Sequence, residues 1–202
     1  MRGRRAVIKR LFDVVVSALL LIALSPLIIA VAILVFAFLG EPLLFRHPRI
    51  GIDGKPFSLI KFRTMKNLPE GVDPLPDSDT DRLVPFGTWL RKWSLDELPQ
   101  LWQVLRGEMS LVGPRPMPLR YLQRYSAYHA QRHSIRPGLT GLASARYRNQ
   151  CTWTERLDAD VWYVHNHSLW LDIKILWESV STVLLKRGND GTNSMPDFEG
   201  GI

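Results

Sequence analysis

The sequence predicts a mainly α-helical protein with a minor β component. It has a helix-break-helix membrane hairpin, interfacial amphipathic helices and a small cytoplasmic globular domain. Three features lead to this prediction. An uncharged apolar run covers residues 14–39 and is broken near its middle by Ser25-Pro26. Helical spacing or composition recurs in residues 82–106, 119–133, 153–164 and 169–186. A single short stretch, residues 57–62 (F-S-L-I-K-F), has the composition of a strand.

The apolar run is long enough to cross a bilayer. A straight helix over its 26 residues would reach about 39 Å, and a bilayer core needs only about 20 residues. Proline lacks an amide hydrogen and clashes with the carbonyl four residues earlier, so Pro26 predicts a bend. The hydroxyl of Ser25 can help to satisfy the carbonyl that is freed. A single tilted span that tolerates the proline remains the alternative interpretation.

Charge favours the bent form over the span. Short basic flanks prefer the cytoplasmic side of a membrane, and both ends of this run are basic, so both ends are expected on the same side. Arg2, Arg4, Arg5, Lys9 and Arg10 precede the run, and Arg46, Arg49, Lys55, Lys61 and Arg63 follow it. We therefore predict a re-entrant hairpin that enters one leaflet and returns.

The rest of the chain divides by composition. Residues 1–40 hold the basic N-terminus and the hairpin, residues 41–187 a domain at the membrane interface, and residues 188–202 a flexible tail. Residues 67–81 are acidic and proline-rich, as in surface loops, and residues 136–141 (R-P-G-L-T-G) are expected to form a turn-rich loop. The helix over residues 82–106 should be interrupted near Trp93.

A stripe of apolar residues along the last predicted helix has two interpretations. Its members recur at helical spacing and are Trp170, Ile173, Trp177, Val180 and Leu184. The stripe could face the core of the domain. It could also lie in the membrane interface, where tryptophan is favoured.

Overall composition narrows the classes of function without choosing one. The net charge of +7 and a pI of about 9.9 suit nucleic acid, an anionic membrane surface or phosphate-rich substrates. The single cysteine, Cys151, excludes a disulfide within one chain and a cysteine-based metal site. His129 and His133 could share a helix face, but without an acidic residue between them a zinc site is disfavoured.

Two adjacent carboxylates, Asp96 and Glu97, invite two explanations. In S-L-D-E (residues 94–97), Ser94 and Glu97 fit a capping box at a helix start, which would make both acids structural. Adjacent carboxylates can instead divide a phosphoryl transfer between them, one attacking phosphorus and the other holding a divalent cation. Positive charge for the phosphate oxygens is available from Lys61, Arg63, Arg91 and Arg115, although each arginine taken alone is better explained as a solvated surface charge.

Three longer motifs decide between these explanations. They are K-F-R-T-M at residues 61–65, S-L-D-E-L-P-Q-L-W-Q-V-L-R-G-E-M-S-L-V-G-P-R-P at residues 94–116, and R-P-G-L-T-G at residues 136–141. With the Ser25-Pro26 hairpin and L-D-I-K at residues 171–174, they resemble the bacterial sugar transferases called monotopic phosphoglycosyl transferases. The resemblance covers residues 8 to about 187, and its long central block outweighs the capping-box interpretation.

The resemblance implies a transferase that moves a sugar-1-phosphate from a UDP-sugar to polyprenyl (undecaprenyl) phosphate. It would release UMP and initiate a cell-surface glycan from the cytoplasmic face of the bacterial inner membrane, as a monotopic protein. Asp96 would be the nucleophile that forms a covalent phosphosugar intermediate, and Glu97 its partner and the ligand of Mg²⁺. The substrate-binding positions implied by the resemblance are Lys61, Arg63, Arg91, Arg115, Arg136, Asp160 and Asp172.

The sequence departs from the family pattern after residue 141, where W-A-Q is usual and Leu142-Ala143-Ser144 stands here. The particular sugar is therefore not predicted, and the sequence leaves monomer and homodimer open. A membrane-anchored basic binding module without catalysis is the main alternative, and it would tolerate Asp96→Asn. A nucleic-acid binder is favoured by charge alone, because no nucleic-acid motif is recognised.

Overall fold

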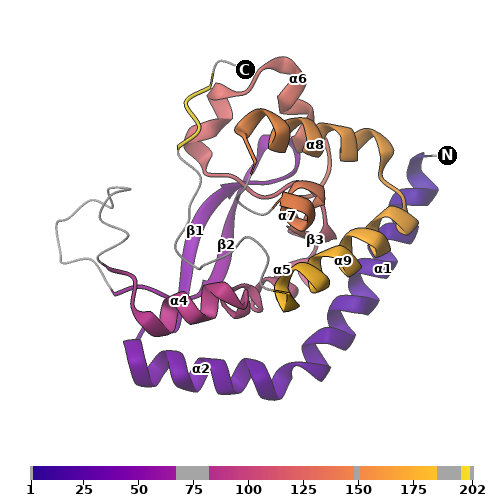
Figure 1. Cartoon of the computed structure of the whole chain (residues 1–202). Helices are drawn as coiled ribbons and strands as arrows, with labels where there is room; N and C mark the ends of the chain where they lie inside the picture. Colours follow the sequence, from indigo (N-terminus) through magenta and orange to yellow (C-terminus); the bar gives the residue numbers. More distant parts are fainter. Residues whose placement is uncertain (1, 67–81, 148–150, 186–196, 201–202) are drawn as a thin grey trace.

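The computed structural model describes residues 2–66, 82–147, 151–185 and 197–200, with the backbone alone for residues 2–5 and 184. Helices make up most of this part and surround two small sheets (Figure 1), which confirms a mainly helical protein with a minor β component. Strands β1 (Leu44–Ile50) and β2 (Pro56–Phe62) pair antiparallel, and β3 (Ser110–Val112) pairs in parallel with β4 (Gly138–Thr140).

The predicted bend is present at the serine–proline pair. Helix α1 (Arg2–Ala23) and helix α2 (Ser25–Leu39) meet at Leu24 and are bent by 63°. The Ser25 Oγ donates to the carbonyl oxygen of Ile22 at 2.8 Å, the carbonyl that the Pro26 ring denies to the helix ladder. Among the described helices, none meets the length and hydropathy criteria for a bilayer span alone, but the bent pair meets them together.

Helix α1 is part of the core of the domain rather than a detached anchor. The guanidinium of Arg10 donates to the carbonyls of Val104 and Leu105 at 2.6 and 2.7 Å, at the end of helix α5 (Gln100–Arg106). The buried carboxylate of Asp13 accepts from Ser110 Oγ at 2.8 Å and from the amide of Leu111 at 3.1 Å. The apolar face of α1 packs beside α5 and β3, so α1 and the globular part share one core.

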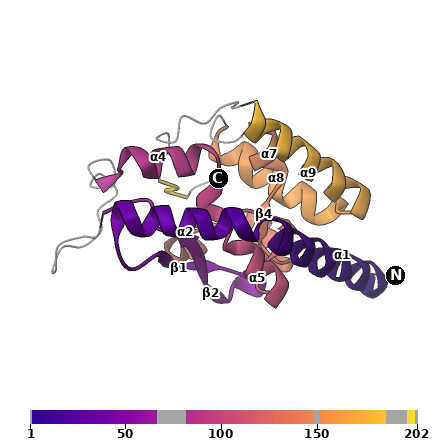
Figure 2. The same cartoon turned by 90° about the horizontal axis from the view of Figure 1, so that it is seen from below.

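Helix α2 lies along helix α4 (Pro85–Lys92), as Figure 2 shows from below. Val31 and Val35 of α2 are buried with Phe62 of β2 and Leu90 of α4. The chain then leaves α4 at Trp93 and passes through a short 3₁₀ turn, η3 (Leu95–Glu97), into α5. The interruption predicted near Trp93 is confirmed.

Strands β1, β3 and β4 were not predicted. Pro48 interrupts the β pattern in β1, and the glycines and proline of residues 136–141 favoured a loop. The prediction of a loop there is wrong because β4 forms by pairing with β3, far away in the sequence. A Cβ at Gly138 would lie 2.1 Å from the amide nitrogen of Gly113, so only glycine permits this close approach.

The C-terminal half contains the two longest remaining helices. Residues 119–133 are helical as predicted but broken into η4 (Leu119–Arg124), α6 (Ala127–Ala130) and η5 (Gln131–Ser134). Helices α7 (Leu142–Tyr147), α8 (Trp153–Asn166) and α9 (Leu169–Leu184) follow. The predicted helices at residues 153–164 and 169–186 correspond to α8 and α9.

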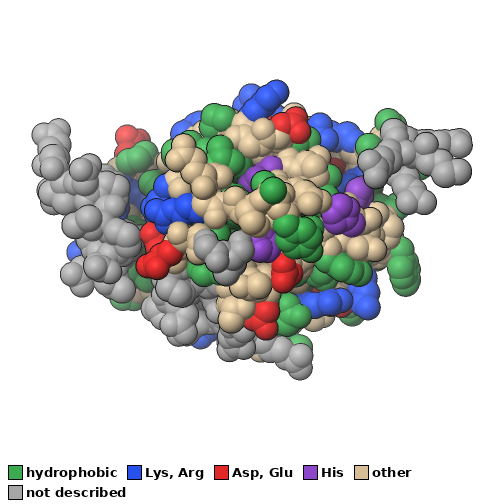
Figure 3. All heavy atoms as spheres, turned by 90° about the horizontal axis from the view of Figure 1, so that it is seen from above, with side chains coloured by type: hydrophobic (Ala, Val, Ile, Leu, Met, Phe, Trp, Pro, Cys, Tyr) green, Lys and Arg blue, Asp and Glu red, His purple; other side chains and the backbone are tan. Residues whose placement is uncertain are grey.

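The apolar stripe on α9 faces outward. Trp170 and Trp177 are 77% and 74% exposed, and Ile173 and Val180 are also exposed, so the core interpretation of the stripe is wrong. Ile175 and Asp172 of α9 are buried instead. Apolar side chains of α1 and α2 are exposed too: Val7, Leu11, Leu19 and Ile22 in α1, and Ile29, Ile33, Phe36 and Phe38 in α2. The face of the molecule that points away from α2, seen in Figure 3, mixes acidic, basic and histidine side chains with scattered hydrophobic ones.

The acidic loop predicted for residues 67–81 lies outside the described residues, as does most of the predicted tail. Residues 197–200 are described, and there the tail is ordered. Phe198 is buried against Tyr121, Tyr125 and Trp153. A phenylalanine in a Gly/Asn/Asp-rich stretch gave the only sign of this contact.

Candidate active site

Asp96 and Glu97 lie on the 3₁₀ turn between α4 and α5. Ser94, just before them, adopts a left-handed backbone (φ 55°, ψ 24°) and makes no side-chain cap bond, so the capping-box interpretation is wrong. Pro99 stands at the N-cap of α5, where its missing amide hydrogen costs no helical bond. A serine held in a conformation that favours glycine indicates that the fold constrains this turn tightly.

Two cations converge on the dyad from other elements. Lys61, at the end of β2, places its Nζ 2.6 Å from Glu97 Oε1 and 3.8 Å from Asp96 Oδ2. Arg115, in the segment after β3, places an Nη 3.3 Å from the same Glu97 oxygen. The structure thus brings Lys61 and Arg115 to the two carboxylates, as the sequence analysis expected for a phosphate site.

The two carboxylates have opposite electrostatic environments. Burial raises the pKa of Asp96, and the adjacent charge of Glu97 adds to this, although Lys61 acts against it. Burial would also raise the pKa of Glu97, but Lys61 and Arg115 outweigh it and hold that pKa at about 2. Glu97 is therefore a firmly ionised, ion-paired group. Asp96 is a buried carboxylate whose charge is poorly compensated, the condition of a reactive oxygen nucleophile.

Arg91 of α4 is positioned on the Asp96 side. Its Nε donates to Thr64 Oγ1 at 3.0 Å, and its charge acts to lower the pKa of Asp96. Helix α4 can approach this closely because Gly87 has no side chain. A Cβ at this position would lie 1.8 Å from the carbonyl oxygen of Thr64. Thr64 belongs to the K-F-R-T-M motif, so this bond connects the motif to the arginine.

A small cavity of about 50 Å³ opens beside Glu97. It lies between the β1–β2 hairpin, the start of α5 and the segment that carries Arg115. Its lining includes Arg49, Lys61, Glu97, Gln100, Arg115, Met117 and Leu139. A carboxylate dyad, several cations and an adjoining cavity form a site suited to a phosphorylated ligand.

Comparison with known proteins agrees with this chemistry. A family model described as bacterial sugar transferase matches residues 4–186. The chain belongs to the bacterial sugar transferase family. It is 43% identical over 187 residues to EpsL, an uncharacterised sugar transferase of Bacillus subtilis, and the match covers 93% of this chain and 92% of that relative.

Two further relatives carry names that state a reaction. A UDP-glucose:undecaprenyl-phosphate glucose-1-phosphate transferase of Caulobacter vibrioides is 42% identical over 185 residues, covering 87% of this chain and 69% of the relative. A Klebsiella pneumoniae protein of the same name is 38% identical over 189 residues, covering 89% of this chain and 41% of the relative. This sugar transferase therefore spans less than half the length of the Klebsiella protein.

Three of the predicted substrate-binding residues of this sugar transferase have other roles in the structure. Arg63 is buried, and its guanidinium donates to the carbonyls of Leu39, Gly40 and Glu41, where it holds the end of α2. Arg136 donates to the carbonyl of Gly107 on the surface at 2.8 Å.

Asp172 is the third. It is fully buried, accepts from Lys9 Nζ at 2.6 Å and from the hydroxyl of Tyr163 at 2.5 Å, and so ties α1 to α8 and α9. In this structure its carboxylate is used by Lys9 and Tyr163, and its expected contact with substrate stays a prediction. All three residues lie in motifs that carry the resemblance, and in the structure their side chains bond to the scaffold.

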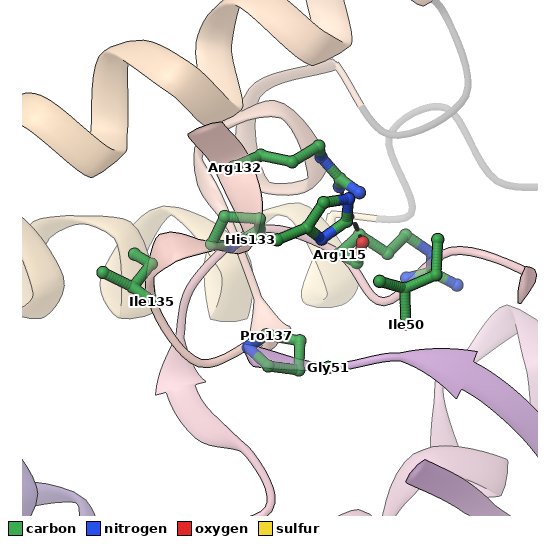
Figure 4. A pocket seen from close by; sticks show the side chains of 8 residues that line it. Ile50, Gly51, Arg115, Arg132, His133, Ile135 and Pro137 are labelled. Carbon is green, nitrogen blue, oxygen red and sulfur yellow. Dashed lines mark hydrogen bonds between the residues drawn. The ribbon is translucent and has the colours of Figure 1, made fainter. Parts of the chain in front are cut away.

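Asp160 acts on the site through a neighbour. Its Oδ2 accepts from the Nε and Nη2 of buried Arg132 at 3.1 and 2.5 Å, and Arg132 Nη2 also donates to the carbonyl of Arg115 at 2.7 Å. Figure 4 shows the guanidinium of Arg132 pointing toward the backbone of Arg115, with His133 beside it. The buried pair thereby fixes the backbone of a residue that contacts Glu97. Arg132 was not predicted, since it stood in an unremarkable helical stretch.

The two histidines considered for zinc do not share a site. Both side chains are buried, but His129 Nε2 contacts Asp158 at 3.0 Å, whereas His133 Nε2 has no hydrogen-bond partner among the described residues. Within those residues, no cluster of three histidine, cysteine or acidic side chains could hold a metal.

Buried His133 should make the protein less stable in mild acid. Burial, and then the charge of Arg132, lowers the pKa of His133 to about 3 from the unfolded value of 6.5. Below pH 6.5 the unfolded state binds a proton that the folded state excludes, so stability falls as pH falls. Between pH 7 and pH 5, His133 should cost about 2 kcal/mol, at 1.36 kcal/mol per pH unit.

Denaturant unfolding at both pH values measures this loss, and His133→Gln should reduce it by most of that amount. The exposed His165 provides the matched control, His165→Gln, which should leave the pH dependence as in the wild type. An unchanged pH dependence in His133→Gln would contradict the assignment.

Proposed function

We propose that the protein transfers a sugar-1-phosphate from a UDP-sugar to undecaprenyl phosphate at the cytoplasmic face of the bacterial inner membrane, releasing UMP and starting a cell-surface glycan. The names of the Caulobacter and Klebsiella relatives support this reaction class. The observation that carries the proposal is the pairing of a buried Asp96 with an ionised Glu97 under Lys61 and Arg115. Family membership and this geometry point to the same chemistry.

The first half-reaction makes a covalent intermediate. A carboxylate oxygen of Asp96 attacks the phosphorus that bears the sugar, and the bond from that phosphorus to the bridging oxygen breaks. UMP departs with the bridging oxygen, and the sugar phosphate stays on Asp96 as an acyl phosphate. Lys61, Arg91 and Arg115 stand where they can stabilise the negative charge on the phosphoryl oxygens as it redistributes.

The second half-reaction regenerates the enzyme. A phosphate oxygen of the polyprenyl phosphate attacks the same phosphorus, and the bond to Asp96 breaks. The products are the polyprenyl diphosphate sugar and the free Asp96 carboxylate. The acceptor must approach from the membrane, which requires the dyad to lie near the lipid headgroups.

The outer surface of the helices supports such a position. We propose that α1 and α2 form a re-entrant hairpin, with the exposed apolar side chains of both arms in the lipid. The exposed Trp170 and Trp177 of α9 would then lie at the headgroup level, where tryptophan is favoured. A monotopic protein held in this way would keep its catalytic domain at the interface.

The residues of the dyad can supply part of the ligand set of a Mg²⁺ ion. The protein offers two adjacent carboxylates, and Mg²⁺ is commonly bound by one or two carboxylates together with substrate phosphates and water. Both cation contacts of Glu97 use Oε1, so Glu97 would hold the metal through Oε2. When bound, Mg²⁺ would neutralise charge on the diphosphate.

The test is UMP release by the purified protein in nanodiscs that contain undecaprenyl phosphate and Mg²⁺, supplied with a panel of UDP-sugars. Release from one donor, together with formation of the lipid-linked sugar and its loss with EDTA, is the expected result. Release of free sugar-1-phosphate or of UDP in place of UMP would contradict the proposed bond cleavage. Absence of any product from a broad panel would favour a non-catalytic anchor.

A further inference from the structure

Two buried hydrogen-bond donors face the cavity beside Glu97 without an acceptor. They are the Nε of Arg49, on β1, and the Nε2 of Gln100, at the start of α5. In the described part of the chain, neither atom has a hydrogen-bond partner. Buried donors without partners are rare in native proteins. Two that line the same cavity indicate that an acceptor atom of a ligand belongs between them.

Arg49 differs from the other cations of this region. Lys61 and Arg115 contact Glu97, and buried Arg132 contacts Asp160. The guanidinium of Arg49 forms no such ion pair among the described residues. Its backbone is nevertheless fixed, because Arg49 bridges to Pro118 and the next residue, Ile50, donates to the carbonyl of Met117 at 2.9 Å. The protein therefore holds Arg49 in place without using its charge internally.

The surrounding charge favours an anion over a neutral acceptor. Burial, and then the positive charges of Arg115 and Arg120, lowers the pKa of Arg49 to about 10, against smaller opposing effects of Tyr121 and Glu97. Arg49 remains a cation at neutral pH, and the charges of two other arginines act on it. An anionic group in the cavity would relieve this repulsion and accept from both orphan donors, and phosphoryl oxygens match guanidinium and amide donors well.

We infer that Arg49 and Gln100 form a phosphate-binding subsite next to the carboxylate dyad, with both side chains donating to phosphoryl oxygens of a substrate. The identity of that substrate rests on the proposed function. Two sources share the same chemistry, the diphosphate of the nucleotide-sugar donor and the phosphate of the polyprenyl acceptor. The cavity alone does not distinguish them, but the two half-reactions do.

The first measurement is calorimetric binding of inorganic pyrophosphate to the full chain in nanodiscs. Arg49→Ala and Gln100→Leu should each weaken the affinity about 10- to 100-fold, the range for a hydrogen bond to a charged group. Arg49→Lys keeps the charge but loses the Nε donor, so it should fall between the wild type and Arg49→Ala. Arg46→Ala is the matched control, because Arg46 is an exposed arginine of the same strand.

Equal pyrophosphate affinity in Arg46→Ala and Arg49→Ala, or a loss in Arg49→Ala with none in Gln100→Leu and Arg49→Lys, would overturn the subsite. Circular dichroism of each variant shows whether it is folded. If Arg49→Ala does not fold, Arg49→Lys and Gln100→Leu still decide the question. Because pyrophosphate binding needs no turnover, this result stands even if no UDP-sugar is ever consumed.

Kinetics then assign the phosphate source. If the subsite binds the donor, Arg49→Ala and Gln100→Leu should raise the concentration of UDP-sugar needed for half-maximal UMP release in a single turnover without acceptor. If the subsite binds the acceptor, the same two variants should leave that step unchanged and raise the KM for undecaprenyl phosphate. Unchanged half-saturation for both substrates in Arg49→Ala and Gln100→Leu would refute a role in substrate binding. Lack of UMP release by the wild type would instead refute the proposed function.

Discussion

Asp96→Asn is expected to lower UMP release by at least about a thousandfold, since removing the nucleophile of a covalent mechanism costs several orders of magnitude. The amide has nearly the same shape as the carboxylate but does not attack phosphorus. Intact mass spectrometry of the wild type with UDP-sugar and no acceptor should show an added sugar phosphate, and Asp96→Asn should show none. Asp158→Asn, which removes a half-exposed carboxylate that contacts His129, should retain full activity.

The same substitution should leave the fold intact or strengthen it. The raised pKa of Asp96 means that the folded protein disfavours the ionised carboxylate, chiefly because the group is buried. A neutral amide avoids this cost, so the Tm of Asp96→Asn should equal or exceed that of the wild type. Lost activity with retained or raised Tm would separate chemistry from folding. Undiminished UMP release in Asp96→Asn would show that the nucleophile lies elsewhere.

The features predicted correctly from the sequence are those that depend on residues close together along the chain. Pro26 predicts a bend because its ring always blocks the carbonyl four residues earlier, and the nearby Ser25 predicts how that carbonyl is satisfied. Helices α8 and α9 followed from local spacing and composition in the same way. Strand β4 could not be predicted locally, because Gly138 and its neighbours become a strand only when β3 pairs with them.

The direction in which a helix face points, and the partners of a given side chain, were harder to predict because both depend on residues that are distant in the sequence. The stripe of Trp170 and Trp177 has helical spacing whether it faces a core or a membrane. The sequence analysis grouped Lys61 and Arg115 with the dyad because all four residues lie in the long motifs of the resemblance, and the folded chain brings these motifs together at the turn that carries Asp96 and Glu97. Arg63 and Asp172 lie in matching motifs as well, but their partners are the end of α2 and Lys9, contacts that only the folded chain defines.

Asp160→Asn is expected to destabilise the protein by about 3–5 kcal/mol, the usual cost of removing one partner from a buried ion pair. Burial raises the pKa of Asp160 as it does that of Asp96, although Arg132 acts against it. The two sites differ in the partner that is left behind, because Arg132 would remain buried, 1% exposed, without its counter-charge. Asp158→Asn, two residues earlier on α8, is the matched control. Its carboxylate is 51% exposed and contacts His129, so its loss should cost about 1 kcal/mol or less. Denaturant unfolding in one detergent compares the two variants.

The double variant Arg132→Met with Asp160→Leu separates a scaffold role from a direct one. Replacing both partners by apolar residues of similar size removes the uncompensated charge, so most of the lost stability should return. The same variant loses the bond from Arg132 to the carbonyl of Arg115, so the Arg115 segment is less firmly held. If the pair acts only through this segment, kcat should fall modestly, with little change in KM for the UDP-sugar. A KM that rises sharply in a double variant of restored stability would show instead that Asp160 or Arg132 binds the substrate itself, as the motif resemblance implied for Asp160.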